Sequence, residues 1–123
     1  MSLAIATVFA ASAFAGSAVA ATPAPRAENA FLSQQDAAAR SARVSNVAYA
    51  LEFTLTGKET FSGVTTASFD LADNAAPLTI DLDKATVKSV SVNGKPVQAK
   101  YNNWFVTIAA ADLAKGRNTV VIA

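Results

Sequence analysis

VSNVAYALEFTLTG, residues 44–57, is the stretch that decides the fold class. Large apolar residues alternate in it with small, polar or charged ones: Val47, Tyr49, Leu51, Phe53 and Leu55. Successive side chains of a strand point to opposite faces of a sheet, so a period of two indicates one apolar face. The stretch therefore predicts a half-buried strand of about a dozen residues.

The chain turns after this strand and returns. Gly57-Lys58-Glu59 is typical of a turn. TFSGVTTASFDLA, residues 60–72, then repeats the period of two, with these residues on one side: Phe61, Gly63, Ala67, Phe69 and Leu71. The two segments together predict an antiparallel hairpin.

Shorter strand signals fill the rest of the chain, at residues 78–83, 87–92, 95–101, 104–108 and 119–123. Asn93-Gly94 favours a type I′ turn because both positions tolerate positive φ. Pro96 indicates an edge position, since proline cannot donate to a ladder. In the segment 104–108, Trp104, Val106 and Ile108 are expected to point inward. Residues 110–118, AADLAKGRN, are expected to be a loop that could include one helical turn.

About seven strands separated by frequent turns predict an all-β fold, an antiparallel β-sandwich or saddle-like sheet. One short surface helix is expected before the first strand. Ser33 and Asp36 resemble a capping box at its start, and the residues up to Arg43 are mostly good helix formers. Arg40 and Arg43 lie in its last turn, where positive charge suits the helix dipole.

The first 25 residues contain no charged side chain, and residues 1–21 are an apolar run that ends in small residues. Ala18-Val19-Ala20 fits a signal-peptidase site, so that cleavage would leave Ala21 as the first residue. We therefore expect a signal peptide over residues 1–20, a linker over 21–30 and a β domain over 31–123, and so an exported protein, periplasmic or secreted. A retained membrane anchor and a cytosolic protein with an artefactual leader are the alternatives.

The composition excludes most familiar catalytic sites. The chain has no histidine and no cysteine. It can therefore form no Ser-His-Asp triad, no thiolate nucleophile and no HExxH zinc helix. Its formal net charge is +1 and Lys84, Lys88, Lys95 and Lys100 are dispersed, so no nucleic-acid-binding surface is expected.

A few polar clusters remain as weak candidates for chemistry, each with a simpler structural explanation. Asp81 and Asp83 are expected on the same face of a strand, a spacing open to an acid–base pair or a hard cation. Carboxylates and an amide that could hold calcium gather at a strand end: Asp70, Asp73 and Asn74.

Two further candidates are hydroxyl groups and an aromatic cluster. Ser62, Thr65 and Thr66 could act as nucleophiles only with a lysine base such as Lys58 or Lys84, for which no signature exists. The aromatic stretch from Tyr101 to Phe105 could form a binding platform for a carbohydrate or peptide, although core packing explains it more simply. We therefore assign no catalytic and no metal-binding residue.

Three segments, in this order, resemble the N-terminal domain of the zinc-dependent aminopeptidase N family. They are LSQQDAAARSARVSNVAYALEFTLTGKETFSGVTTASFDL (residues 32–71), APLTIDLDKATVKSVSVNGKPV (76–97) and DLAKGRNTVVIA (112–123). The resemblance implies a β-saddle domain that packs beside a thermolysin-like catalytic domain. The family's GAMEN, HExxH and TQ.E motifs are absent here, so none of its active-site residues can be carried over to this chain.

The resemblance thus implies that zinc and peptide substrate are bound by a catalytic domain that this sequence lacks. The sequence would then be a truncated part of an exported aminopeptidase, inactive alone, and its exposed domain face could self-associate. The alternative function is a free-standing exported β-domain for binding or adhesion.

Overall fold

The computed structural model describes residues 25–123. The predicted signal segment, its cleavage site at Ala18, Ala20 and Ala21, and the start of the linker lie outside the described residues. The elements are, in chain order, α1 (Gln34–Arg43), β1 (Val44–Thr54), β2 (Ser62–Leu71), β3 (Leu78–Asp81), β4 (Val90–Val92), β5 (Lys95–Pro96), β6 (Lys100–Tyr101), β7 (Phe105–Ile108), the 3-10 turn η1 (Ala110–Asp112) and β8 (Gly116–Ile122). Within residues 25–123, no helix combines the length and apolar character that a membrane crossing requires.

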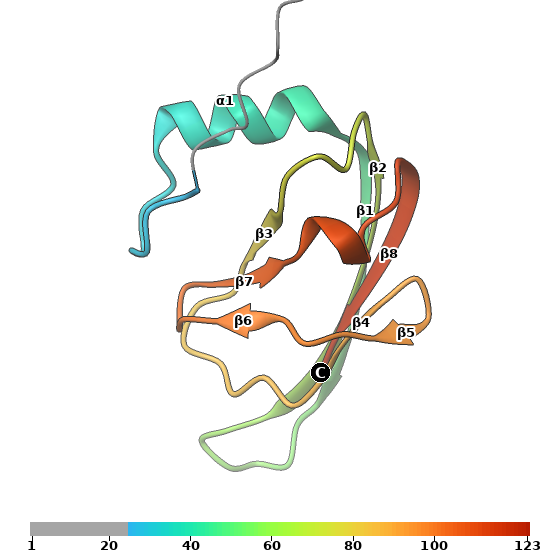
Figure 1. Ribbon diagram of the computed structural model, residues 1–123. Helices are drawn as coiled ribbons and strands as arrows, with labels where there is room; N and C mark the ends of the chain where they lie inside the picture. The colour runs from blue at the N-terminus through green and yellow to red at the C-terminus, as the bar shows by residue number, and fades with distance from the viewer. Residues whose placement is uncertain (1–24) are drawn as a thin grey trace, which may run out of the picture.

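The strands form two antiparallel sheets, which confirms the all-β, sandwich-like prediction (Figure 1). The large sheet has the strand order β1-β2-β8-β4-β5 and the small sheet the order β3-β7-β6. The segment 95–101, expected as one strand, is two short strands that belong to different sheets. Pro96 cannot donate to a ladder, and the chain crosses between the sheets after it.

The hydrophobic core lies between the small sheet and the middle of the large one. Its buried side chains come from β2, β8 and β4 on one side and from β3 and β7 on the other: Ala67, Phe69, Leu71, Val120, Ile122, Val90, Val92, Leu78, Val106 and Ile108. Directly opposite residues of neighbouring strands share a face, as Val92 and Val120 do. Each central strand therefore presents alternate residues to one core, as the period of two predicts.

The predicted hairpin is present, but the prediction that β1 is half-buried is wrong. Residues 48–54 pair regularly with β2, from Ala48 opposite Ser68 to Thr54 opposite Ser62. Only Val44 of β1 is partly buried, and the rest of the strand is exposed on both faces. Among the described residues, the small sheet does not extend over β1, so no second layer covers the apolar face of this strand.

A β-bulge interrupts the regular pairing of β1 with β2 near the start of β1. Ser45 lies opposite Asp70 and Ala48 opposite Ser68, so Asn46 and Val47 together face a single residue of β2. Asn46 has a φ of 51°, a conformation that asparagine tolerates better than most residues. Because the extra residue shifts the alternation by one, both Val44 and the odd-numbered residues after the bulge lie on the core side of the sheet.

The predicted surface helix and its cap are confirmed. The side chain of Ser33 accepts a hydrogen bond from the backbone N–H of Asp36 (3.0 Å), and no residue of α1 is buried. Arg43, in the last turn, donates to the backbone oxygens of Ala76 (2.9 Å) and Pro77 (3.2 Å) in the loop before β3. Charge-assisted hydrogen bonds, more than apolar contacts, thus hold α1 against the sheets.

The buried side chain of Asn118 in β8 joins three segments. Its Oδ1 accepts hydrogen bonds from the N–H of Ala114 (2.9 Å) and from Nδ2 of Asn93 (3.1 Å). Its Nδ2 donates to the backbone oxygens of Ala114 (2.7 Å) and Gly116 (2.9 Å). Asn93 begins the predicted Asn-Gly turn, and both turn residues have positive φ as expected (51° and 79°). The amide thus fixes this turn against the loop that precedes β8.

Replacing this buried amide should destabilise the fold strongly. Asn118→Ala leaves several buried polar groups without partners, so we expect a loss of about 3 kcal/mol in unfolding free energy. Urea denaturation followed by circular dichroism measures it. Gln98→Ala, the loss of an exposed amide, is the control, with an expected change within about 0.5 kcal/mol. Equal stability of the two variants would contradict the role given to Asn118.

Candidate functional site

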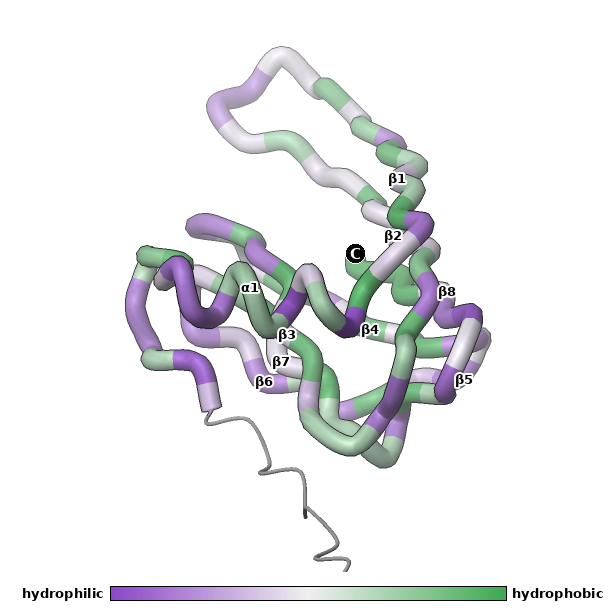
Figure 2. Tube along the Cα trace, turned by 90° about the horizontal axis from the view of Figure 1, so that it is seen from above, coloured by the Kyte–Doolittle hydropathy of each residue, from purple (hydrophilic) through white to green (hydrophobic). Residues whose placement is uncertain are grey.

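The most unusual surface of the molecule is the apolar side of the hairpin. We call it the hairpin face; it consists of Val47, Tyr49, Leu51, Phe53, Leu55 and Phe61. Tyr49, Leu51 and Phe53 are 63%, 55% and 58% exposed, although they occupy the side of the large sheet that faces the core. Figure 2 shows the hairpin extending beyond the other strands, with hydrophobic positions recurring along it. Soluble domains seldom expose so many neighbouring large apolar side chains without a function.

The hairpin face is a direct continuation of the core. Tyr49 lies opposite Ala67 in the β1–β2 ladder, and opposite residues share a face. Ala67 is buried in the core, whereas Tyr49, one strand further out, is not. Within residues 25–123, the small sheet therefore covers only a part of this continuous apolar surface.

Two aromatic rings form the outer end of the hairpin face. Phe53 and Phe61 pack edge to face, with ring centroids 5.6 Å apart. Gly63, opposite Phe53 in the ladder, leaves room for this arrangement, because a Cβ there would lie only 3.1 Å from the Phe53 ring. The pair gives this end a defined shape although both rings are largely exposed.

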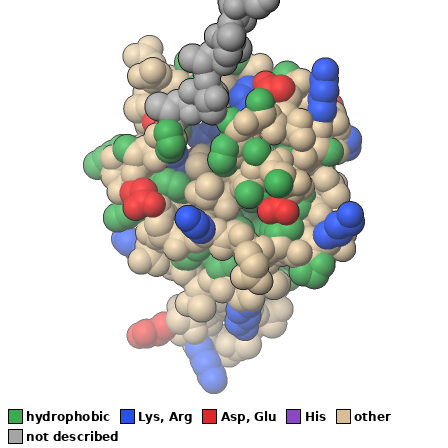
Figure 3. Space-filling model, viewed as in Figure 1, with side chains coloured by type: hydrophobic (Ala, Val, Ile, Leu, Met, Phe, Trp, Pro, Cys, Tyr) green, Lys and Arg blue, Asp and Glu red, His purple; other side chains and the backbone are tan. Residues whose placement is uncertain are grey.

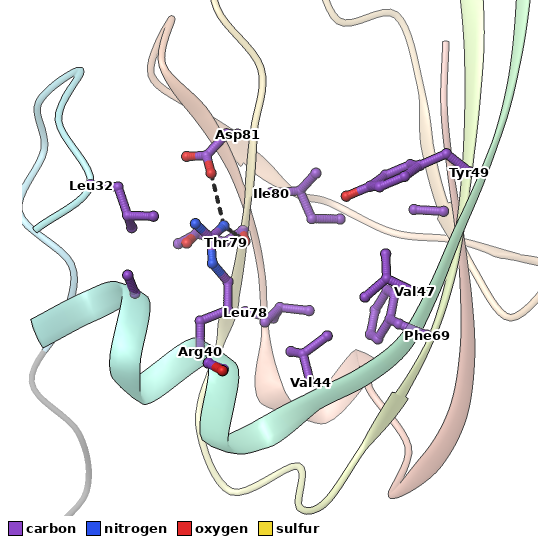
Figure 4. Close-up of a pocket in the computed structure, with 13 residues that line it drawn as sticks. Leu32, Arg40, Val44, Val47, Tyr49, Phe69, Leu78, Thr79, Ile80 and Asp81 are labelled. Carbon is purple, nitrogen blue, oxygen red and sulfur yellow. Dashed lines mark hydrogen bonds and ion pairs between the residues drawn. The ribbon is translucent and has the colours of Figure 1, made fainter. Parts of the chain in front are cut away.

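At its inner end the hairpin face opens into a groove of about 420 Å³ between α1, β1 and β3. The groove has an apolar floor and walls, with one charged edge. Figure 4 shows Tyr49 on β1 and Ile80 on β3 extending into it from opposite sides, with Arg40 and Asp81 at the other end. Such a groove can take up apolar side chains of another segment.

Asp81 at the charged edge binds two arginines. Arg40 of α1 donates to its Oδ2 (2.8 Å), and Arg26, from the segment before the helix, donates to its Oδ1. Partial burial favours the protonated carboxyl, but the hydrogen bonds and charges of Arg26 and Arg40 outweigh it and hold the pKa of Asp81 below its usual value. This cluster carries one net positive charge and ties both segments to β3.

Arg26 also packs against the core. Its guanidinium carbon lies 4.2 Å from the ring centroid of Phe105, and its side chain is only 6% exposed. A cation over an aromatic ring is an electrostatically favourable arrangement. This role of Arg26 could not be predicted from the sequence, because Arg26 lies in the expected linker and an isolated arginine after Pro25 carries no recognisable pattern.

The acidic candidates each lie beside other structural groups. Asp81 ends β3 and Asp83 lies after the strand, exposed; both line one shallow pocket, where Asp81 is bound by Arg26 and Arg40. Asp70 accepts from Asn46 (2.7 Å), Asp73 accepts from the N–H of Ala75 (3.0 Å), and Asn74 donates to the backbone of Leu113 (2.9 Å). Each therefore has a structural partner of its own. Among the described residues, no three acidic, histidine or cysteine side chains gather as a metal would require.

Among the described residues, no hydrogen bond joins the candidate hydroxyl nucleophiles to the lysines considered as their bases. Thr65 and Thr66 sit in the middle of β2, paired with β1 on one side and β8 on the other. Lys58 is exposed in the hairpin loop, and Lys84 is exposed in the turn after β3. On the face shown in Figure 3, the Lys and Arg side chains lie apart from one another.

The aromatic stretch from Tyr101 to Phe105 is mostly structural. Tyr101 donates its hydroxyl to the oxygen of Leu82 (3.0 Å) and accepts from the N–H of Ala85 (2.8 Å), while Phe105 is buried. The expectation that Trp104 points inward is wrong: it is 37% exposed and precedes β7. Asn102 accepts from the backbone N–H groups of Trp104 and Phe105, and this turn moves the tryptophan out of the strand.

The Asp81 cluster predicts a pH-dependent contribution to stability. Asp81→Asn should lower the unfolding free energy by about 1 kcal/mol at neutral pH, discounted for the partial exposure of the carboxylate. Because the pKa is lower in the folded state, the contribution is present above the pKa of an unfolded aspartate, about 3.9, and is lost as the pH falls through the folded value. Urea denaturation at a series of pH values should show the two proteins converging in acid.

Asp83→Asn is the control for this experiment, since it removes an exposed carboxylate two residues away. At neutral pH it should change the unfolding free energy by less than about 0.5 kcal/mol. A deficit in Asp81→Asn that stays constant into strong acid would contradict the assignment.

The described residues therefore include a surface suited to apolar contact, with arginines at one edge. What this surface does must be inferred from its geometry and from the sequence pattern. Comparisons of the chain with family models, curated proteins and solved structures give no match.

Proposed function

We propose that residues 31–123 are the non-catalytic N-terminal β domain of an exported zinc aminopeptidase. In this proposal the hairpin face and the groove are the surface against which the catalytic domain packs. The three segments that resemble the aminopeptidase N family, in their order along residues 32–123, support the assignment to that family. The uncovered hairpin face supports the docking role.

The single observation that carries the docking role is that the core side of the large sheet continues, uncovered, onto β1. An apolar face of a sheet is stable in water only when another layer covers it. Tyr49, Leu51 and Phe53 lie on that face and are more than half exposed. A second domain with an apolar surface of its own would complete the layer. Its side chains would also enter the groove beside Arg40.

In this arrangement the chain contributes binding surface and orientation, and the catalytic domain contributes the chemistry. The described residues do not fit a zinc site, because no group of suitable ligands comes together among them. Zinc and the peptide substrate would be held by the catalytic domain. Export is proposed from the apolar leader, with cleavage between Ala20 and Ala21. The mature chain would then begin at Ala21, five residues before Arg26.

The test has two steps. The coding sequence downstream of Ala123 should encode GAMEN and then HExxH; a downstream sequence with neither motif contradicts the family assignment and leaves the free-standing binding module. In the protein that includes the following domain, Leu51→Asp should lower the unfolding free energy by about 2–3 kcal/mol, because it buries a charge at the domain contact. Thermal or urea denaturation measures this loss.

Thr54→Asp is the matched control, since Thr54 lies on the opposite face of the same strand and is exposed. It should change the stability of the two-domain protein by less than about 0.5 kcal/mol. Equal effects of the two substitutions would contradict docking through the hairpin face. The chain alone should show no turnover of a chromogenic amino-acid substrate, with or without zinc.

A further inference from the structure

The two edges of the large sheet differ in how they are protected against pairing. At one edge, β5 is two residues long and consists of Lys95 and Pro96, and a lysine and a proline are both common defences of an edge. At the other edge, β1 is 11 residues long. After its bulge, the strand from Ala48 to Thr54 reads AYALEFT, with Glu52 as its one charge and with neither proline nor lysine.

The edges of the small sheet are also protected. Along β3, Arg40 donates to the backbone oxygen of Thr79 (3.4 Å) and Arg26 reaches its hydroxyl (3.5 Å). The other edge, β6, has two residues and includes Lys100. Within residues 25–123, the part of β1 from Ala48 to Thr54 is therefore the long edge to which no side chain donates; before it, Arg117 donates to the backbone oxygen of Asn46 (3.1 Å). Such an edge offers a row of free backbone N–H and C=O groups.

We propose that β1 pairs with β1 of a second copy of this chain, antiparallel, about a two-fold axis at Leu51. The regular stretch from Ala48 to Thr54 is centred on this residue. In that register Leu51 lies opposite itself, and Tyr49 lies opposite Phe53 of the second copy. Glu52 lies opposite Ala50 of the second copy, so the two Glu52 carboxylates do not face each other. The strand is thus complementary to itself, as a two-fold interface requires.

The size of the free edge of β1 suits pairing with the same strand of a second copy better than an interface with a larger partner. Edge pairing covers the backbone edges and only the neighbouring parts of Tyr49, Leu51 and Phe53, so the interface falls below the roughly 1,200 Å² of stable specific complexes. The dimer is therefore expected to be weak. The dimer pairs the backbone edge of β1, whereas domain docking covers the outward surface of the hairpin face. Substitutions at Ala50 and Glu52, on the opposite face of the strand, therefore test the dimer without changing the docking surface.

Single cysteines test the register directly, because the chain has none of its own. The full chain, leader included, is expressed, and the protein is purified in the form that the host produces. It is then oxidised at several concentrations. Leu51→Cys should cross-link to its copy, since opposite Cβ atoms lie about 5 Å apart, within reach of a disulfide. Thr54→Cys should not, since the two copies of that position lie about 20 Å apart along the strands.

Charge substitutions on the other face of β1 test the same register without touching the hairpin face. Ala50→Glu places the introduced carboxylate opposite Glu52 of the second copy, twice in each dimer. Sedimentation velocity should show the dissociation constant rise about tenfold. The double variant Ala50→Glu with Glu52→Lys should restore the original value, because both pairs then have opposite charges.

Three results would overturn the proposal. The first is a protein that stays monomeric to millimolar concentration. The second is equal cross-linking of the two cysteine variants, which would indicate association without this register. The third is a dimer whose dissociation constant Ala50→Glu leaves unchanged. Selective cross-linking at position 51, together with the loss and recovery of affinity, would establish the pairing.

Discussion

The packing of the small sheet against β2, β8 and β4 supplies the buried core on which the rest of this structure depends. The small sheet has strands of only two to four residues, whereas β1 and β2 have 11 and 10. The second layer therefore ends before the first strand of the large sheet. The core side of that sheet continues into solvent as the hairpin face, and the open edge of β1 lies beside it.

Polar contacts hold the segments that the core does not reach. Arg40 and Arg43 join α1 to β3 and to the loop before it, and Arg26 joins the preceding segment to Asp81 and Phe105. Each arginine can donate several hydrogen bonds in a fixed plane, which suits backbone oxygens and carboxylates. These contacts form one wall of the groove and leave its apolar floor open.

The sequence predicted what depends on local pattern and missed what depends on tertiary contact. The period of two in β1 and β2, the Asn93-Gly94 turn and the cap at Ser33 are local, and all three are confirmed. A period of two shows that one face is apolar, but it does not show whether anything covers that face, so β1 was wrongly expected to be half-buried. The bulge at Asn46 and the arginine contacts have no pattern in the sequence, because their partners are distant along the chain.

The central claim is that residues 25–123 leave the apolar face of β1 uncovered, which is the basis of the proposed docking surface. The most direct test compares the same substitution on adjacent strands, in dilute monomeric protein by urea denaturation. Leu71→Ser, in the core side of β2, should cost about 4 kcal/mol of unfolding free energy, whereas Leu51→Ser should cost less than about 1 kcal/mol. Equal and large losses would show that the chain covers this face itself, and would contradict the account.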